Sequence, residues 1–297
     1  MDVLEEQNPR VTVNLKELLN LAKKAPLVDL SHQRIRAGQN GGYVSRFKGR
    51  GMEFDETRIY QAGDDIRSID WRVTARTNTT HSKVFREERE RPVFISVDAR
   101  PAMRFATRGV FKSVQAAKLA ALLAWAAQLN GDRVGGQVFN EHGCQELKPA
   151  SGKRAVLHFF NALVNPKPST QIDDIPLERV LLRLIQHARP GSLLYIISDF
   201  RGLNEQHEAY LSKLARHCEI VLIHVYDPLE SHLPEKGRYR FSDGAQEVTV
   251  DSGDKQRVLA YHQQFQQRQA YLMELCKKWR MNLLQCTTRE QAIEVLS

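Results

Sequence analysis

Short apolar runs separated by longer helical stretches fill the chain from residue 92 to residue 297. This alternation is typical of βαβ units built around a parallel sheet. Strands are predicted over residues 93–97, 133–139, 193–198, 220–225 and 283–286, with residues 143–148 as a candidate for one more. Helices are predicted over residues 110–130, 151–164, 176–189, 204–217 and 289–296. We therefore expect an α/β domain over residues 92–297 with a doubly wound, mainly parallel sheet.

The N-terminal part of the chain has a different pattern, which predicts an α+β extension over residues 1–91. Leucines at helical spacing predict a short docking helix over residues 14–24, and Pro26 ends the pattern. Residues 31–51 are rich in glycine and arginine, which favours a loop or a mobile strand pair. Residues 53–91 alternate charged and apolar positions, so we expect an extended, charged segment there.

An insertion over about residues 228–281 separates the last two predicted strands. A polar hairpin is predicted over residues 238–250 and a long helix over residues 254–280. At ~1.5 Å per residue this helix is ~40 Å long, which is more than a crossover connection needs. We expect it to project from the domain or to pack against the N-terminal segment.

The composition is that of a folded protein, because 42% of the residues are hydrophobic. The net charge of +8 leaves an anionic partner possible, but acidic residues are mixed with the basic ones along most of the chain. The four cysteines form no C-x-x-C pair, which argues against a zinc ribbon. No apolar run approaches the roughly 18 to 20 residues that span a bilayer, so we expect a soluble cytoplasmic protein.

Two aspartates, Asp98 and Asp199, end predicted strands and form the candidate site. Ligands of doubly wound sheets bind outside the carboxyl ends of the strands, where the strand order reverses. If the two strands are neighbours there, the carboxylates lie close together and require a cation. In many folds of this type that cation is Mg²⁺, which prefers oxygen ligands.

The motif around these aspartates resembles the metal-ion-dependent adhesion site of von Willebrand factor A domains. That site has the pattern D-x-S-x-S with a later threonine and a later aspartate, and the resemblance implies a partner-binding site at Asp98, Arg100, Ala102, Thr170 and Asp199. Arg100 and Ala102 stand in place of the two serines, and neither side chain offers an oxygen. The sequence therefore favours a degenerate site without a metal, in which Asp98 and Asp199 are the ligands of any Mg²⁺ that does bind.

Two interpretations of Arg100 remain open. In the first, its guanidinium lies between Asp98 and Asp199 as a built-in cation, because its bidentate geometry suits carboxylates. In the second, Arg100 points to solvent and Asp98 caps the following turn.

The segment upstream of the predicted sheet carries a more specific resemblance. Its fixed positions are Glu53, Phe54, Arg58, Tyr60, Gly63, Asp64, Asp65, Arg67, Ile69, Asp70, Trp71, Ala75 and Arg76. This pattern closely resembles the signature of bacterial proteins of the domain of unknown function 58 family, and the resemblance runs from about residue 30 to the end of the chain.

The signature combines arginines, carboxylates and two aromatic side chains that we expect to be buried, Tyr60 and Trp71, which suits an ion-pair platform that holds the segment against the α/β domain. The alternative is a basic face for nucleic acid or an acidic partner, formed by Arg58, Arg67, Arg72 and Arg76. We favour the platform, because the interleaved carboxylates would cancel a field that attracts phosphate.

Sequence patterns of catalysis are weak. The glycines at 131, 135 and 136 lead into a strand and not into a helix, so they form no dinucleotide loop, and no Walker A sequence occurs. His81, His142 and His158 have no nucleophile partner by spacing. We therefore expect a protein that is not an enzyme and needs no cofactor.

The family resemblance implies protein partners: a MoxR-type AAA+ ATPase and other von Willebrand factor A-like proteins. We expect an adaptor in the assembly or maturation of client proteins, which presents the loops after Asp98, near Thr170 and after Asp199. The alternative function is nucleic-acid binding by a basic loop that contains Arg34, Arg36, Arg46, Lys48 and Arg50.

Overall fold

The computed structural model describes residues 8–28, 30, 52–61, 64–87, 92–165, 177–233, 237–242, 247–251 and 254–297. The chain divides into two compact units, Met1–Leu30 with Arg91–Ser297 and Ser31–Glu90. We call the first the α/β unit and the second the signature unit. Thr170, Gly63 and the basic positions 34–50 lie outside the described residues.

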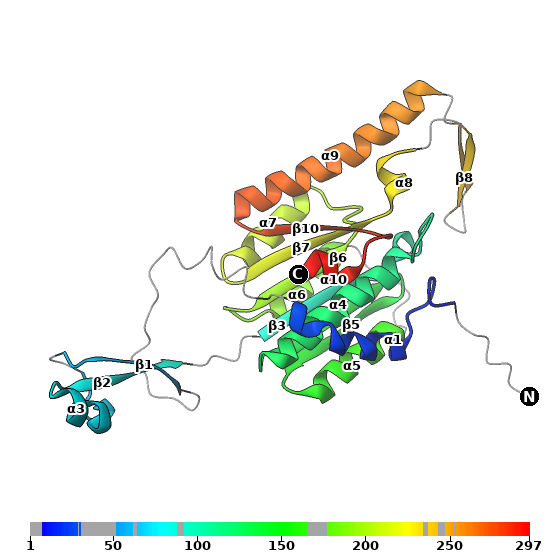
Figure 1. Ribbon diagram of the computed structural model, residues 1–297. Helices are drawn as coiled ribbons and strands as arrows, with labels where there is room; N and C mark the ends of the chain where they lie inside the picture. The colour runs from blue at the N-terminus through cyan, green and yellow to red at the C-terminus, as the bar shows by residue number, and fades with distance from the viewer. Residues whose placement is uncertain are drawn as a thin grey trace, which may run out of the picture. The chain divides into compact units, whose positions relative to one another are not determined.

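A six-stranded sheet with the order β10-β7-β6-β3-β4-β5 forms the centre of the α/β unit (Figure 1). Its strands are β3 (Pro92–Asp98), β4 (Arg133–Asn140), β5 (Gly143–Ala150), β6 (Leu193–Ser198), β7 (Glu219–Tyr226) and β10 (Asn282–Thr287). All neighbours are parallel except β5, which pairs antiparallel with β4. The mixed α/β fold with a mainly parallel sheet is thus confirmed, and the candidate strand at 143–148 is a hairpin partner of β4.

The strand order reverses between β3 and β6. From β3 the chain moves outward to β4 and β5, and it then returns to the opposite side of β3 to form β6, β7 and β10. Val93 to Val97 pair in register with Leu193 to Ile197. The carboxyl ends of β3 and β6 therefore lie side by side at the switch point of the sheet.

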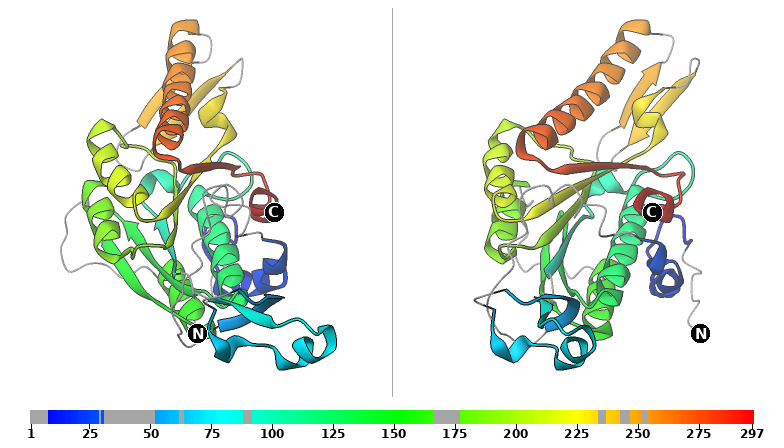
Figure 2. Two further views of the ribbon diagram at one scale, coloured as in Figure 1. Left: turned by 90° about the vertical axis from the view of Figure 1, so that its left-hand side faces the viewer. Right: turned by 60° about the vertical axis from the view of Figure 1, so that its left-hand side comes forward.

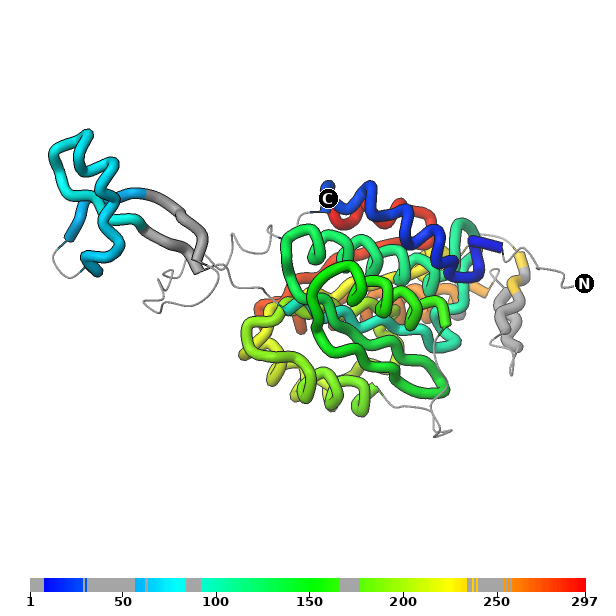
Figure 3. Tube along the Cα trace, turned by 90° about the horizontal axis from the view of Figure 1, so that it is seen from below, coloured from blue at the N-terminus to red at the C-terminus, as the bar shows by residue number. Residues whose placement is uncertain are grey.

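Helices cover both faces of the sheet. The helices on one face are α1 (Leu15–Asn20), α4 (Lys112–Leu129), α5 (Lys153–Val164) and α10 (Ala292–Leu296), and those on the other are α6 (Leu177–His187), α7 (Glu205–Ala215) and α9 (Lys255–Trp279). Figure 3 shows α1 and α10, in blue and red, along the outer side of the first layer. Helix α4 is buried almost all round, because it lies between the sheet and these outer helices.

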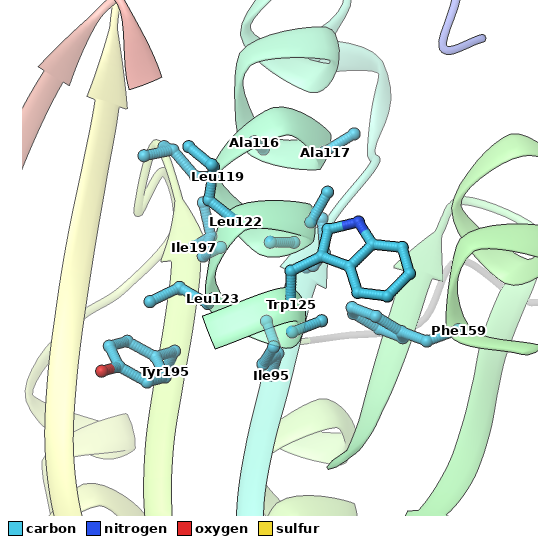
Figure 4. Close-up of a cluster of buried hydrophobic side chains, with 14 of the residues drawn as sticks. Ile95, Ala116, Ala117, Leu119, Leu122, Leu123, Trp125, Phe159, Tyr195 and Ile197 are labelled. Carbon is cyan, nitrogen blue, oxygen red and sulfur yellow. The ribbon is translucent and has the colours of Figure 1, made fainter. Parts of the chain in front are cut away.

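The larger hydrophobic core lies between α4 and the sheet (Figure 4). Leu119, Leu122 and Leu123 of α4 pack with residues of β3 and β6. Trp125 packs edge-on against Phe160 of α5, with ring centroids 5.6 Å apart. This packing holds α4 against β3 and β6.

The N-terminal segment belongs to the α/β unit, whereas the sequence grouped residues 1–91 in one extension. Leu18 and Ala25 are buried in the larger core. The indole N–H of Trp125 donates a hydrogen bond of 3.1 Å to the carbonyl of Leu18. The docking helix is therefore part of the fold of the sheet domain, and the boundary of the separate unit comes after Leu30.

The insertion consists of α8 (Pro228–Ser231), the hairpin of β8 (Arg238–Ser242) with β9 (Glu247–Asp251), and the long helix α9, which Figure 2 shows in orange. Phe265 and Leu272 of α9 are buried, and Leu272 belongs to the smaller core together with residues of α6 and α7. The helix does not pack against the part of the N-terminal segment that belongs to the α/β unit, because α1 packs in the larger core and α9 covers the opposite side of the sheet.

The signature unit contains an antiparallel pair, β1 (Met52–Ile59) and β2 (His81–Glu87), with the helix α3 (Trp71–Thr77) between them. Asp70 caps α3 by accepting hydrogen bonds from the backbone N–H groups of Arg72 and Val73. The purely extended segment that the sequence predicted therefore holds a helix, which begins at this aspartate.

Candidate functional site

Asp98 and Asp199 meet at the switch point of the sheet. Asp98 is the last residue of β3, Asp199 directly follows β6, and both side chains are fully buried. Ser198 links them, because its hydroxyl donates a hydrogen bond of 2.6 Å to Oδ2 of Asp98. The expected proximity of the two strands is confirmed by their pairing.

The cation of Asp98 comes from its own loop. The Arg100 guanidinium donates from Nε to Oδ1 at 3.0 Å and from Nη2 to Oδ2 at 2.7 Å. The backbone N–H of Arg100 also donates to Oδ1 at 3.0 Å, so Asp98 caps the turn as well. Both interpretations of this loop are therefore partly realised: Asp98 caps the turn, and Arg100 is folded back onto it.

Asp199 is paired with a different cation, Lys112, which is the first residue of α4. The ammonium of Lys112 lies 2.9 Å from Oδ2 of Asp199 and 2.7 Å from Oε1 of Glu230 in α8. Lys112 itself is fully buried. The idea that Arg100 neutralises both aspartates therefore needs correction, since a lysine from a distant helix reaches Asp199.

A second arginine closes this cluster from the outside. Nη2 of Arg201 lies 2.6 Å from Oε1 of Glu230, and Nε lies 3.5 Å from Oδ2 of Asp199. The side chain of Arg201 is 47% exposed, in contrast to Lys112. We call Asp199, Lys112, Glu230 and Arg201 the buried cluster.

The turn after β6 is shaped to bring Arg201 to this position. Phe200 adopts a left-handed conformation with φ of 52°, which is uncommon for a bulky residue. Its N–H donates to the hydroxyl of Ser198 at 2.9 Å, and the N–H of Arg201 donates to Oδ1 of Asp199 at 3.0 Å. The two side chains at the end of the strand thus hold the backbone of the turn.

The ionisation of Asp199 is favoured by this environment. Burial would raise its pKa, but the charge and the hydrogen bond of Lys112 and the N–H of Arg201 outweigh that effect and hold the pKa below its usual value. The carboxylate is consequently charged at neutral pH.

Asp227 ties three loops together beside the buried cluster. It lies at the end of β7 and accepts hydrogen bonds from the hydroxyls of Thr107 and Thr288, both at 2.6 Å. The backbone N–H groups of Thr107 and Leu229 donate to it at 2.9 Å. Burial raises the pKa of Asp227, but these hydrogen bonds outweigh burial and lower it overall.

The adhesion-site positions that the structure describes, Asp98, Arg100, Ala102 and Asp199, do not fit a divalent cation. Both oxygens of Asp98 already accept hydrogen bonds from Arg100, and Oδ2 accepts a further one from Ser198. Ala102, in the turn Pro101–Met103, has no side-chain oxygen to offer. Within the described ranges, no three His, Cys, Asp or Glu side chains are grouped so that they could hold a metal ion.

Groups that often act as nucleophiles or bases have unfavourable environments. Burial raises the pKa of the Cys144 and Cys286 thiols to about 12 and that of Cys276 to about 11. Burial lowers the pKa of His224 to about 4, and neither ring nitrogen has a hydrogen-bond partner. These thiols are protonated and this imidazole is a weak base at neutral pH.

The signature unit contains part of the predicted ion-pair network. Nη2 of Arg58 lies 2.7 Å from Oδ1 of Asp64. Asp65 instead caps a turn by accepting from the N–H of Arg67, and Asp70 caps α3. Trp71 is 68% exposed within this unit, so the expected burial of both aromatic side chains is not seen.

The sequence missed most members of the buried cluster. Lys112 and Glu230 are separated from Asp199 by 87 and 31 positions and belong to elements whose packing the sequence does not specify. Arg201 was findable, since it is two residues from Asp199, the same spacing that led to Arg100.

Comparison with known proteins gives family-level matches. The family described as "Protein of unknown function DUF58" matches residues 56–271. Uncharacterized proteins of Mycobacterium tuberculosis (Rv1480) and Mycobacterium bovis (Mb1516) are 27% identical over 239 residues, which cover 77% of this chain and 74% of theirs. None of the helices in the described part of the chain combines the length and the apolar composition needed to cross a membrane.

Two solved structures are more distantly similar. A conserved hypothetical protein BatB from Bacteroides thetaiotaomicron and an aerotolerance-related membrane protein from Bacteroides fragilis are each 15% identical, with a TM-score of 0.46. Each match covers 69% of this chain and 94% of the solved chain.

Proposed function

Starting from the fact that this chain belongs to the DUF58 family of proteins of unknown function, we propose that it is a non-enzymatic, cytoplasmic protein-binding adaptor. It acts with a MoxR-type AAA+ ATPase, and with other von Willebrand factor A-like proteins, in the assembly or maturation of client proteins. The α/β unit is of the von Willebrand factor A type with a degenerate adhesion site.

The single observation that carries this proposal is the pairing of both buried aspartates at the switch point with side-chain cations. A metal-bearing adhesion site captures a carboxylate of its partner through the ion. Here the guanidinium of Arg100 donates hydrogen bonds to the carboxylate of Asp98, and Lys112 and Arg201 form ion pairs with Asp199. The site keeps the paired aspartates and the partner-facing cations, while it lacks the open coordination position that metal-assisted hydrolysis requires.

The mechanism follows from which of these cations are accessible. Lys112 is fully buried and holds α4, the turn after β6 and α8 together. Arg100 and Arg201 keep 20% and 47% of their side-chain surface exposed. Lys112 therefore maintains the geometry of the loops, and the two arginines present positive charge at the carboxyl edge of the sheet to a partner.

Recovery of the tagged chain from its native cell, with and without ATP, tests the adaptor function. We expect a MoxR-type AAA+ ATPase among the co-purifying proteins, and we expect its yield to fall with Arg201→Ala, which removes the more exposed of the two arginines. Arg216→Ala is the matched control, because Arg216 follows α7, before β7 begins, and so lies at the opposite edge of the sheet. Absence of any such ATPase under both conditions would remove the proposal.

The salt dependence of binding separates this function from nucleic-acid binding by the basic positions 34–50. Binding to phosphates weakens by orders of magnitude between low and physiological salt, whereas a specific protein interface changes less. Tight binding of DNA or RNA with a steep salt dependence, lost on neutralising Arg46 and Arg50, would favour the alternative function.

A further inference from the structure

The outer face of α3 in the signature unit exposes a large apolar side chain. Trp71 is 68% exposed within this unit. The inner side of the helix packs beside β2, where Thr74 accepts a hydrogen bond of 3.0 Å from the N–H of His81 (Figure 1). A tryptophan left this open on the surface of a small unit is typical of an interaction site.

Two arginines share this face with the tryptophan. Arg76 follows Arg72 by four residues, which is about one helical turn. Trp71 and Ala75 have the same spacing, so the four positions form one side of the helix. All four side chains are exposed, whereas the two positions between them are partly buried. Neither arginine forms an ion pair or a side-chain hydrogen bond with any residue that the structure describes.

The carboxylates closest to this face along the chain are engaged by other groups. Asp64 pairs with Arg58 at 2.7 Å. Asp70 caps α3 and lies 3.8 Å from Lys83, and Asp65 caps the turn before the helix. These carboxylates therefore stabilise the backbone and the other basic residues, and they leave the two arginines of α3 without an acceptor.

The charges of the signature unit are unevenly distributed. Residues 57–83 hold five basic and three acidic side chains, a difference of +2 when every carboxylate is ionised. The acidic residues Glu53, Asp55 and Glu56 belong to the first part of β1, which pairs with residues 84–87. Helix α3 lies instead beside the first residue of β2. Its outer face is therefore a region of positive charge.

A partner that covers Trp71 must also supply acceptors for the two arginines. Covering the tryptophan removes water from the adjacent guanidinium groups, and a charge that loses water without gaining a partner is costly. Carboxylates match the paired donors of a guanidinium. A second copy of this face would bring arginines against arginines, so two copies would repel each other.

A nucleic-acid strand fits this face less well than an acidic protein segment does. A strand is bound through several phosphate contacts, and α3 offers two arginines. The carboxylates of Asp64, Asp65 and Asp70 repel a backbone whose charge is spread evenly. A protein segment can place its carboxylates at the arginines alone and an apolar side chain at the tryptophan. Tryptophan and arginine are also the residue types that most often dominate the binding energy of protein interfaces.

We propose that this face of α3, formed by Trp71, Arg72, Ala75 and Arg76, binds an acidic segment of a partner protein. An apolar side chain of the segment packs on the indole, and its carboxylates pair with the two guanidinium groups. The surface belongs to the signature unit and not to the switch point. The inference therefore goes beyond the proposed adaptor function and does not depend on the ATPase.

Calorimetric titration of the full chain with acetyl-Glu-Glu-Leu-Glu-Glu-Leu-Glu-Glu amide tests this surface. We expect binding by the wild type, at least about tenfold weaker binding by Trp71→Ala and at least about fivefold weaker binding by Arg76→Gln. Leu259→Ala and Lys277→Gln are the matched controls, because they remove an apolar group and a positive charge from exposed positions of α9. Their effects should stay below about twofold. Peptides with glutamine for glutamate, or with serine for leucine, should bind more weakly.

Position 75 tests the sign of the charge while every contact of the face is kept. Ala75→Glu places a negative charge beside the tryptophan and the arginines, so it should weaken binding of the peptide at least about threefold. Ala75→Lys should strengthen binding for the same reason. A change in the same direction for both variants would contradict the proposed attraction.

Equal effects of Arg76→Gln and Lys277→Gln would overturn the surface, since they would reveal a general attraction of charge. Absence of binding by the wild type would also overturn it. Tighter binding of an eight-nucleotide thymidylate strand than of the peptide, lost in Arg76→Gln, would identify nucleic acid as the occupant and overturn it as well. A urea titration checks that each variant is folded, and the two variants of Ala75 decide the matter if Trp71→Ala is not.

Discussion

Asp98 and Asp199 occupy equivalent places at the ends of neighbouring strands, yet the chain neutralises them in different ways. Arg100, two residues away, folds back onto Asp98 and keeps 20% of its side chain exposed. Lys112, 87 residues away, reaches Asp199 from α4 and is wholly enclosed. A local cation at the rim can rearrange when a partner binds, whereas an enclosed cation that joins three elements is a fixed part of the fold.

Substitution of the enclosed cation should have the largest effect. Lys112→Met leaves Asp199 and Glu230 buried without their shared partner, and loss of one member of such a group costs about 3 to 5 kcal/mol. The free energy of unfolding from a urea titration measures the loss. Lys118→Met is the control on the same helix, since Lys118 pairs with Glu17 at 3.5 Å near the surface and should cost less than about 1 kcal/mol.

Recovery of stability would identify the cause of the loss. Lys112→Met combined with Asp199→Asn and Glu230→Gln should be more stable than Lys112→Met alone, because the two unpaired charges are gone. If the triple variant is no more stable than the single one, the loss comes from packing and not from charge.

The pH dependence of stability should show the contribution of the charged form of Asp199. The pKa of Asp199 is lowered in the folded protein, so its contribution to stability is complete above the unfolded value of about 3.9 and disappears as the pH falls through the lower folded value. In Asp199→Asn, the free energy of unfolding should therefore decline less steeply between about pH 5 and pH 2 than in the wild type. Glu294→Gln, which removes an exposed carboxylate of α10, is the control.

A decline of the same steepness in Asp199→Asn and the wild type would contradict this assignment. Asp227, whose pKa is also lowered, is present in both proteins and contributes equally to both curves. The difference between the curves therefore isolates Asp199.

Removal of the local cation should cost less. Arg100→Ala takes charge-assisted hydrogen bonds from Asp98, but the hydroxyl of Ser198 and the backbone N–H at position 100 remain. We expect a loss of about 1 to 3 kcal/mol in the urea titration. A loss equal to that of Lys112→Met would mean that the pairs Asp98–Arg100 and Asp199–Lys112 do not differ in their contribution to stability.

The same position also tests the degeneracy of the adhesion site. Arg100→Ser with Ala102→Ser restores two hydroxyl oxygens next to Asp98, and calorimetric titration with Mg²⁺ should then detect binding if the rest of the site is intact. The wild type should bind no Mg²⁺ at this place, because the guanidinium holds both carboxylate oxygens. Clear binding of Mg²⁺ by the wild type would contradict the idea that Arg100 takes the place of a metal ion at Asp98.

The sequence predicted those features of the fold and the site that are set by residues close together along the chain. Predominantly apolar runs located β3, β6 and β7 within a residue or so of their ends, because strands buried on both faces contain few polar residues. The switch point followed from the position of Asp98 and Asp199 at the ends of such strands. The pairing of Asp98 with Arg100 was also within reach, since the loop between them has little freedom.

Features that depend on the packing of distant elements were not predictable. The sequence analysis did not single out Lys112, and only the docking of α4 on the sheet brings its ammonium to Asp199 and Glu230. Helix α9 was recognised by its length, but its mixed polarity did not reveal which side of the sheet it covers. The N-terminal helix was assigned to the wrong unit, because the spacing of its leucines shows that one face is buried but not which part of the molecule buries it.

The exposed cation of the buried cluster should matter least for stability. Arg201 contacts the same carboxylates as Lys112, with Nη2 2.6 Å from Glu230, but its side chain is 47% exposed. Water and salt screen such a pair, so Arg201→Ala should lower the free energy of unfolding by less than about 1 kcal/mol. Arg104→Ala, at a 52% exposed arginine that pairs with Glu141, is the matched control and should behave alike. If Arg201→Ala costs as much as Lys112→Met, exposure does not divide the cations of this site into structural and partner-facing groups, and the mechanism proposed for the adaptor loses its basis.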